Sequence, residues 1–159
     1  YDNLDINDSV SVYVPYINVN NYIYETFGDF TYSHYSSILI DKILQFEKHT
    51  EIVKFYINVY KDHFEIVITD QGKLKLFNTF EYSSKEDFIY YILFTMEQLQ
   101  LNPEKTDVVL LGDIEKESNL YAILFKYIRH ISFGKRTDIY KYHNKPKSDY
   151  SDFVLIHSL

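Results

Sequence analysis

The chain of 159 residues is long enough for one domain or for parts of two small lobes. It contains no cysteine, which excludes disulfides, thiol catalysis and cysteine-based metal sites. Its 16 basic and 23 acidic residues give a formal net charge of −7, so binding to a nucleic-acid backbone is not expected.

The first part of the chain predicts a series of short elements. Residues 1–8 are polar and acidic, and we expect a linker or a loose end there. Residues 9–16 alternate valine with other side chains, which predicts a strand. A short helix should follow and end at Gly28, because glycine suits the left-handed backbone of a helix terminus. A second short strand over 30–34 and a helix that begins at residues 36–37 complete this part.

Three strands joined by short links are predicted next. They cover residues 52–60, 64–68 and 74–80, and in each of them apolar side chains alternate with others. Gly72 can supply the positive φ of the second turn. Links this short permit only an antiparallel meander, because a parallel return needs about a dozen residues or more.

The apolar spacing then changes to that of a helix. Ser83 and Glu86 match a capping box at the start of this helix. Residues 108–111 form a continuous apolar run, which is typical of a strand covered on both faces. A further helix should begin at residues 118–119, and residues 131–133 can add a final strand.

The carboxyl-terminal tail is less regular. Residues 134–152 are charged and show no clear period. The apolar residues 153–156 then predict a closing strand or helix that docks on the core.

The order β-β-β-α-β-α-β predicts the fold class. Right-handed crossovers place the strand over 108–111 beside the strand over 52–60. We therefore predict an α/β ribonuclease-H-like lobe of the actin-like ATPase type. Its mixed sheet combines a three-strand antiparallel meander with parallel strands, and helices flank the sheet. Residues 51–159 would be the second lobe, and residues 1–50 the strand-helix-strand-helix remainder of a first lobe.

A nuclease on this fold would need carboxylates that converge on two metal ions. The first strand of the meander offers Asn58 in place of an aspartate, while Asp113 follows the strand over 108–111. Glu86 and Asp87 lie in the first turn of a helix, where acidic side chains suit the helix dipole anyway. Among the six histidines no pair has the i,i+4 spacing of a helical zinc site. We expect neither metal nor catalytic residues.

A nucleotide site would need a glycine-bearing turn between the first two strands, where backbone amides can approach phosphate. The turn over 60–63 has no glycine, and only Gly112 follows the strand over 108–111. If ATP and Mg²⁺ bind, we expect Lys61, Asp62, Gly112 and Asp113 to face them. The simpler interpretation is that these are turn residues.

The best basic stretch runs from residue 126 to residue 147. Its basic side chains include Arg129, Lys135, Arg136, Lys141 and Lys145. Such a density is typical of a solvated face, and a nucleic-acid-associated module is a weaker alternative.

Several segments resemble those of a known family. They are Lys73–Phe80, Glu86–Tyr91, Glu97–Leu99, Leu111–Gly112 and Lys126–Arg129. Together they resemble an uncharacterised family of the Bacteroidota, a domain of unknown function whose members have an actin-like ATPase fold. The resemblance covers roughly residue 10 to the carboxyl end. It implies two ribonuclease-H-like lobes in an intact member, similar in shape to pilus-assembly and secretion proteins of the actin superfamily. It implies no activity and no catalytic residues.

These observations predict a protein of unknown function that acts as a non-catalytic scaffold or protein-interaction module. The alternative is a divergent ATP-binding protein. We expect another protein as partner and a cytoplasmic location, because no apolar run is long enough to span a membrane and no signal pattern opens the chain. The chain begins at Tyr1 and lacks the early strands of a first lobe, so we expect a fragment.

Overall fold

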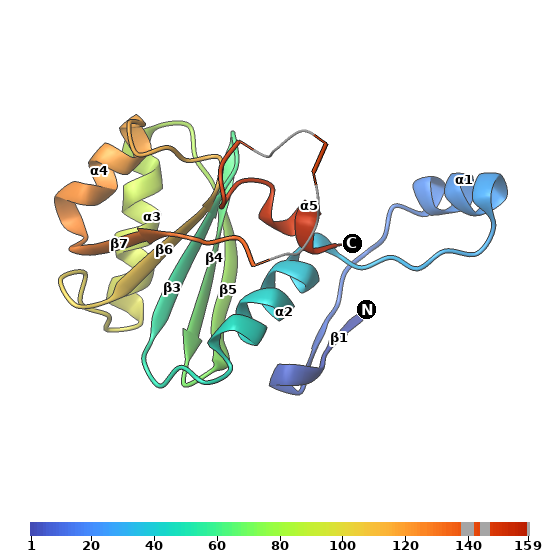
Figure 1. Ribbon diagram of the computed structural model, residues 1–159, viewed down its shortest axis with the longest axis horizontal. Coiled ribbons are helices and arrows are strands. Elements are labelled where there is room, and N and C mark those ends of the chain that lie inside the picture. Colours follow the sequence, from blue (N-terminus) through green and yellow to red (C-terminus); the bar gives the residue numbers. More distant parts are fainter. Residues whose placement is uncertain (138–141, 144–146, 159) are drawn as a thin grey trace.

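The structure is a computed structural model that describes residues 1–137, 142–143 and 147–158. At its centre lies a five-stranded sheet with the order β5-β4-β3-β6-β7 (Figure 1). Its strands are β3 (Lys54–Val59), β4 (His63–Asp70), β5 (Lys73–Glu81), β6 (Asp107–Gly112) and β7 (His130–Phe133). The first three pair antiparallel, while β6 pairs parallel with both β3 and β7. The predicted mixed sheet is therefore confirmed, including the strand over 108–111 beside the opening strand.

Two helices, α3 (Lys85–Gln98) and α4 (Asn119–Tyr127), cover one face of the sheet. These two helices and the sheet enclose an apolar core. Its fully buried members include Phe55, Ile57, Phe64, Ile66, Phe88, Ile92 and Leu110. The alternating pattern of the meander predicts this face, because every second side chain of a strand points the same way.

The capping box of α3 lies one residue later than the sequence suggests. Ser84 accepts from the Asp87 N–H at 3.1 Å, and the Asp87 carboxylate accepts from the Ser84 N–H at 3.0 Å. Glu86 shares the first turn without taking part in the box. The error is small because Ser83 and Ser84 are adjacent and either serine could cap.

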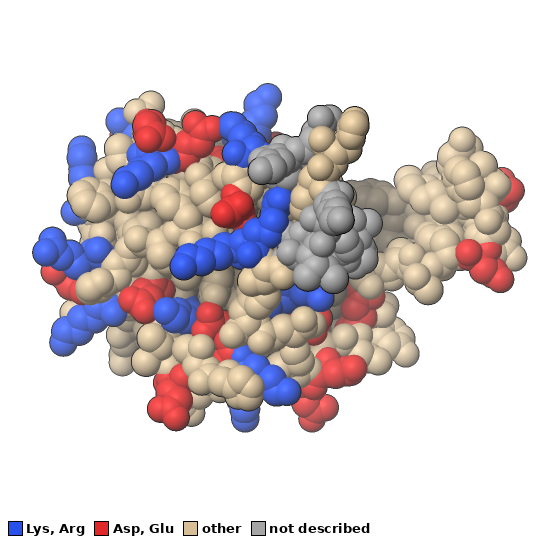
Figure 2. Space-filling model, viewed as in Figure 1, with Lys and Arg blue, Asp and Glu red and all other residues tan. Residues whose placement is uncertain are grey.

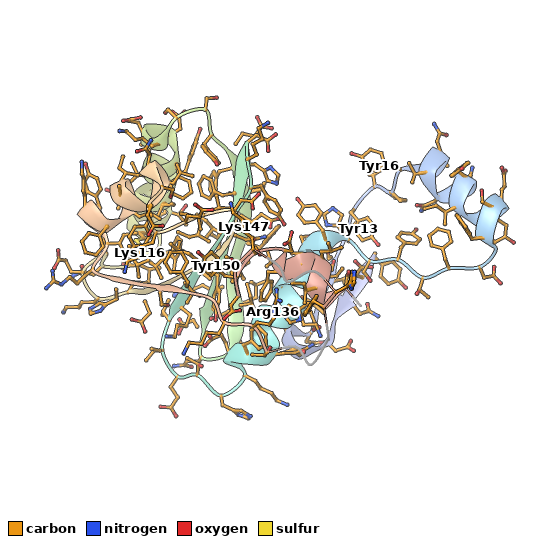
Figure 3. All side chains as sticks on the ribbon, turned by 45° about the horizontal axis from the view of Figure 1, so that its top comes forward. Tyr13, Tyr16, Lys116, Arg136, Lys147 and Tyr150 are labelled. Atoms are coloured by element: carbon orange, nitrogen blue, oxygen red, sulfur yellow. The ribbon has the colours of Figure 1, made fainter. Side chains whose placement is uncertain are left out.

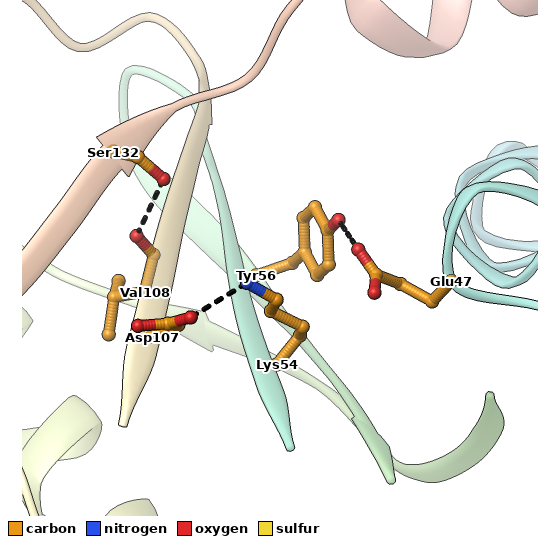
Figure 4. Close-up of polar contacts among 6 residues, drawn as sticks. All are labelled: Glu47, Lys54, Tyr56, Asp107, Val108 and Ser132. Carbon is orange, nitrogen blue, oxygen red and sulfur yellow. Dashed lines mark hydrogen bonds and ion pairs between the residues drawn. The ribbon is translucent and has the colours of Figure 1, made fainter. Parts of the chain in front are cut away.

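The opposite face is covered by α2 (Tyr35–Glu47) and the short helix α5 (Phe153–His157). Polar groups cross this interface (Figure 4). The Tyr56 hydroxyl donates to the Glu47 carboxylate of α2, whereas Lys54 pairs within the sheet with Asp107 of the neighbouring strand β6 at 2.7 Å. At the edge of the sheet, Ser132 Oγ donates to the Val108 carbonyl at 3.4 Å. The docking predicted for the carboxyl-terminal apolar residues is confirmed by α5.

The amino terminus is more ordered than its polar composition suggests. A hairpin joins β1 (Asp2–Leu4) to β2 (Ser9–Ser11) through a 3₁₀ turn. Leu4 is buried against α2, and Asn7 Oδ1 accepts from the Leu74 N–H of β5 at 3.0 Å. The expectation of a loose end over residues 1–8 is therefore wrong, because one apolar side chain and one amide anchor it.

Residues 14–32, which we call the arm, extend away from the rest of the molecule (Figure 1). The arm contains α1 (Ile17–Phe27), and none of the residues of α1, all of which the structure describes, is buried. The strand predicted over 9–16 ends at Ser11, and the one predicted over 30–34 is irregular backbone. Within the described part of the chain, residues 12–16 and 30–34 have no neighbouring strand to supply backbone hydrogen bonds, so alternation alone does not make them strands.

Helix α2 shares a buried core with the central sheet, through Leu39, Ile43 and Val67 among others. Residues 35–47 thus pack on the strands that follow them, while the division of the chain at residue 50 into two lobes stays a prediction. In the predicted basic stretch, Lys141 and Lys145 lie outside the described residues. Among the described residues, no helix is long and apolar enough to cross a membrane.

Candidate functional site

A cleft of about 390 Å³ opens at the carboxyl ends of the parallel strands β3 and β6. Ligands of α/β proteins commonly bind at such strand ends. The start of α2, the end of β3, the turn after β6 and the segment around α5 supply its walls. The residues that line it are Ser33, Tyr35, Ile38, Asn58, Val59, Tyr60, Gly112, Asp113, Asp152, Phe153, Val154, Leu155 and Ser158.

Gly112 is the last residue of β6 and lies opposite Val59 of β3. Its φ of +80° is a left-handed conformation, and a Cβ there would come within 2.2 Å of the Val59 carbonyl oxygen. The Gly112 N–H donates to the Tyr150 carbonyl at 2.8 Å, and the Asp113 N–H donates to the Val59 carbonyl at 2.7 Å. Both amides at this corner of the cleft are thus already bonded within the chain.

The turn between β3 and β4 holds Lys61 and Asp62, which are both exposed and do not line the cleft. The Asp62 carboxylate lies 2.7 Å from His63 Nδ1, and this contact holds the pKa of Asp62 below its ordinary value. The Asp62 carbonyl also accepts from the Tyr82 N–H at 3.0 Å. The structure thus brings Gly112 and Asp113 together at the cleft and places Lys61 and Asp62 on the neighbouring turn.

A polar cluster lies behind the cleft wall. Asn58 Nδ2 donates to Glu65 Oε2 and contacts the Tyr60 hydroxyl, both at 2.9 Å. Glu65 is fully buried, and burial raises the pKa of its carboxyl, an effect that the Asn58 amide partly offsets. Burial, followed by the nearby charge of Glu65, raises the pKa of Tyr60 to about 12.

Tyr35, at the start of α2, also interacts with the Glu65 carboxyl group. Against the larger effect of burial, its hydroxyl helps the Asn58 amide to lower the pKa of Glu65. The Glu65 side chain thus joins β4 to β3 and to the start of α2.

The charged side chains that line the cleft are all acidic. Asp113 and Asp152 belong to its lining, which includes neither Lys nor Arg. Lys147 is near enough for Asp113 to favour its charged form, but its ammonium pairs with Glu115. Figure 3 shows Lys147 and Tyr150 on the body of the molecule and Tyr16 at the start of the arm. The described residues contain no group of three or more His, Cys, Asp or Glu that could hold a metal ion.

Sequence reasoning missed Glu65. A glutamate within the apolar run Phe64–Ile68 reads as a solvent-facing residue of an alternating strand. The available signal was its neighbour two residues later, Val67, which shares its face of β4 and is buried. Because β4 lies between β5 and β3 and α2 covers this face, a charged residue there had to be buried with a partner.

The strand order and the flanking helices give the chain an actin-like ATPase fold. A crystal structure from Bacteroides thetaiotaomicron VPI-5482, of a protein with that fold and unknown function, is similar to the chain with a TM-score of 0.65 and 28% sequence identity. The match covers 72% of this chain and 45% of the Bacteroides chain, so this chain spans less than half of that protein.

The family model of DUF3822, described as a protein of unknown function, matches residues 1–131, and the chain belongs to this family. The resemblance that the sequence indicated is thereby confirmed. The comparison with curated proteins gives no match.

Proposed function

We propose that this protein is a non-catalytic scaffold or protein-interaction module built on an actin-like ATPase fold. The observation that carries the proposal is that both backbone N–H groups at the corner of the cleft are already hydrogen-bonded within the chain. Phosphate sites depend on backbone N–H groups that point at the ligand. Here Gly112 and Asp113 donate theirs to the Tyr150 and Val59 carbonyls instead.

The charge of the cleft gives independent support. A nucleoside triphosphate is strongly anionic and needs cationic side chains or metal ions to balance it. The lining supplies Asp113 and Asp152 and no Lys or Arg. A phosphate in this cleft would meet carboxylates and the already bonded amides.

The arm supports a protein partner. Val14, Ile17 and Phe27 are 90%, 64% and 77% exposed, and most of its other large apolar side chains are also exposed. Residues 14–32 include Glu25 and Asp29 but no basic residue, and the arm is largely neutral in Figure 2. Contiguous exposed apolar surface of this kind marks interaction sites in soluble proteins.

Isothermal titration with Mg-ATP tests the proposal on the whole chain. We expect no binding heat at millimolar nucleotide, with circular dichroism confirming that the protein is folded. Micromolar binding accompanied by ATP hydrolysis would overturn the proposal.

A divergent ATP-binding protein is the second candidate. It is favoured by one observation, that Gly112 and Asp113 line a cleft at the ends of parallel strands. Asp113→Asn would test it better than Gly112→Val, because a Cβ at residue 112 would collide with β3. If Mg-ATP binds, the Asp113 variant should weaken magnesium-dependent binding, while the exposed Asp149→Asn should not.

Two further proposals concern the setting of the protein. A cysteine-free chain suits a reducing compartment, and we propose the cytoplasm.

We also propose that residues 1–50 continue a first lobe in a longer protein, with residues 51–159 as the second. Limited proteolysis of such a protein should then cut near residue 50.

A further inference from the structure

We infer that the cleft at the ends of β3 and β6 binds an alkylguanidinium or alkylammonium group. The inference rests on the proposed function and deepens it, because an Arg or Lys side chain of a partner protein carries this chemistry. A free organic cation carries it too, and the two sources are separated by experiment below.

The first observation is uncompensated negative charge. Asp113 and Asp152 line the cleft, and neither forms an ion pair with a described residue. Lys147, whose charged form Asp113 favours, pairs with Glu115. A cationic ligand would supply the missing counter-charge.

The second observation is the buried carboxylate behind the wall. Glu65 is fully buried, and its Oε2 accepts from Nδ2 of Asn58, a residue of the lining, at 2.9 Å. A third carboxyl group therefore lies directly behind the cleft wall, in addition to the two aspartates of the lining.

The third observation is an excess of acceptors. Asn58 Nδ2 is occupied by Glu65 and Tyr60, while Asn58 Oδ1 lies on the Gly112 side, 2.9 Å from where a Cβ of residue 112 would stand. With the two aspartates, this amide oxygen offers acceptors to a ligand rich in N–H donors. A guanidinium has five such donors in one plane and accepts none.

The fourth observation is the shape and nature of the remaining walls. Tyr35, Tyr60 and Phe153 contribute aromatic rings, and Val59 and Leu155 contribute aliphatic surface. Aromatic faces attract guanidinium and ammonium groups, and the aliphatic wall suits the methylene stem of such a ligand. The volume of about 390 Å³ lies within the range of small-ligand sites.

Nuclear magnetic resonance of the whole, isotope-labelled chain tests the inference. The probes are n-butylguanidinium, a short alanine peptide with one central arginine, and the same peptide with citrulline, which has the same shape but no charge. We expect the first two to shift the Gly112, Asp113 and Asn58 amide signals with dissociation constants of about a millimolar, and the citrulline peptide to shift none.

Charge-neutral variants assign the site. The double variant Asp113→Asn/Asp152→Asn should weaken arginine-peptide binding by about tenfold. Asn also suits residue 152, whose φ is +52°, so the fold is retained. The matched control is Asp149→Asn, an exposed residue of the same segment that does not line the cleft, and it should change binding less than twofold.

Each contrary result removes a defined part of the inference. Equal binding of the citrulline peptide, no shift at the cleft, or an equal loss in the Asp149 variant would overturn the cation site. Binding of butylguanidinium without the arginine peptide would keep the site and overturn the partner side chain. Mg-ATP binding would overturn the proposed function by itself, whereas absence of both ATP and cation binding would overturn only the inference.

Discussion

The two faces of the central sheet are built by different rules. The face under α3 and α4 is closed mainly by apolar side chains. The face under α2 and α5 buries Tyr56 against Glu47 and Asn58 against Glu65, beside an apolar cluster. Both faces belong to the same strands, so the difference lies in which alternate residues each strand presents. The apolar face supplies bulk stability, whereas the polar face creates the cleft and fixes how α2 lies on the sheet.

The largest expected loss of stability comes from a substitution in the apolar face. Phe64 is fully buried, and its ring packs on Phe80, Tyr82 and Phe88 with centroid distances of 4.8 to 5.9 Å. Phe64→Ala should lower the free energy of unfolding by about 3–5 kcal/mol in urea titrations. Phe125→Ala is the control, because Phe125 is 65% exposed, and it should change stability by less than about 0.5 kcal/mol. Equal losses would show that this face is not the stabilising one.

A smaller effect is expected on the polar face. Tyr56→Phe leaves the buried Glu47 carboxylate without the hydroxyl that now donates to it, and should cost about 1–3 kcal/mol in the same titration. Adding Glu47→Leu should recover part of that loss, because the unpaired carboxylate is then gone. A double variant that is less stable than the single one would contradict this account and point to packing instead.

Next comes the start of α3, the helix that closes the apolar face. Ser84→Ala removes the side chain that caps the Asp87 N–H and should cost about 1 kcal/mol. Ser83→Ala makes a close control, because the structure gives the Ser83 side chain no cap role. If thermal unfolding ranks the two variants in reverse order, the capping box is misplaced.

The smallest effect is a pH dependence on the polar face. Burial raises the pKa of Glu65 above its ordinary value of 4.5, so the folded state holds the proton more tightly than the unfolded chain. Its contribution to stability is therefore present below about pH 4.5 and is lost as the pH rises through the folded-state pKa. Glu65→Gln should gain stability relative to the natural chain between pH 4.5 and pH 8. A constant difference across that range would show that Glu65 titrates normally.

The apolar face and the strand order could be predicted from the sequence, because they follow from local rules. Alternation at Phe55, Ile57 and Val59 identified one side of β3, and the unbroken run Val108–Leu111 identified a strand covered on both sides. Short links then left the antiparallel meander as the only connection. These features depend on residues that are neighbours in the chain.

The candidate site could be predicted only in part. Gly112 and Asp113 line the cleft and Lys61 and Asp62 do not, while the contact with ATP expected for all four stays a prediction. The roles of Tyr150, Asp152 and Phe153 could not be foreseen, because these residues are remote in sequence from the strand ends beside which they lie. The burial of Glu65 could not be predicted either, because it depends on neighbouring strands that the sequence pattern of one strand does not reveal.

The hydrogen bond from Leu74 to Asn7 has a consequence for solubility. Strand β5 spans nine residues and, in the described part of the chain, pairs only with β4, so it is an open sheet edge. Open edges recruit strands from other molecules and lead to aggregation. Asn7 occupies one outward N–H of this edge, and the exposed Lys73 and Lys75 add charge beside it. The small amino-terminal hairpin thus also protects the edge of β5 from pairing with other molecules. A chain shortened past this hairpin would tend to form intermolecular sheets.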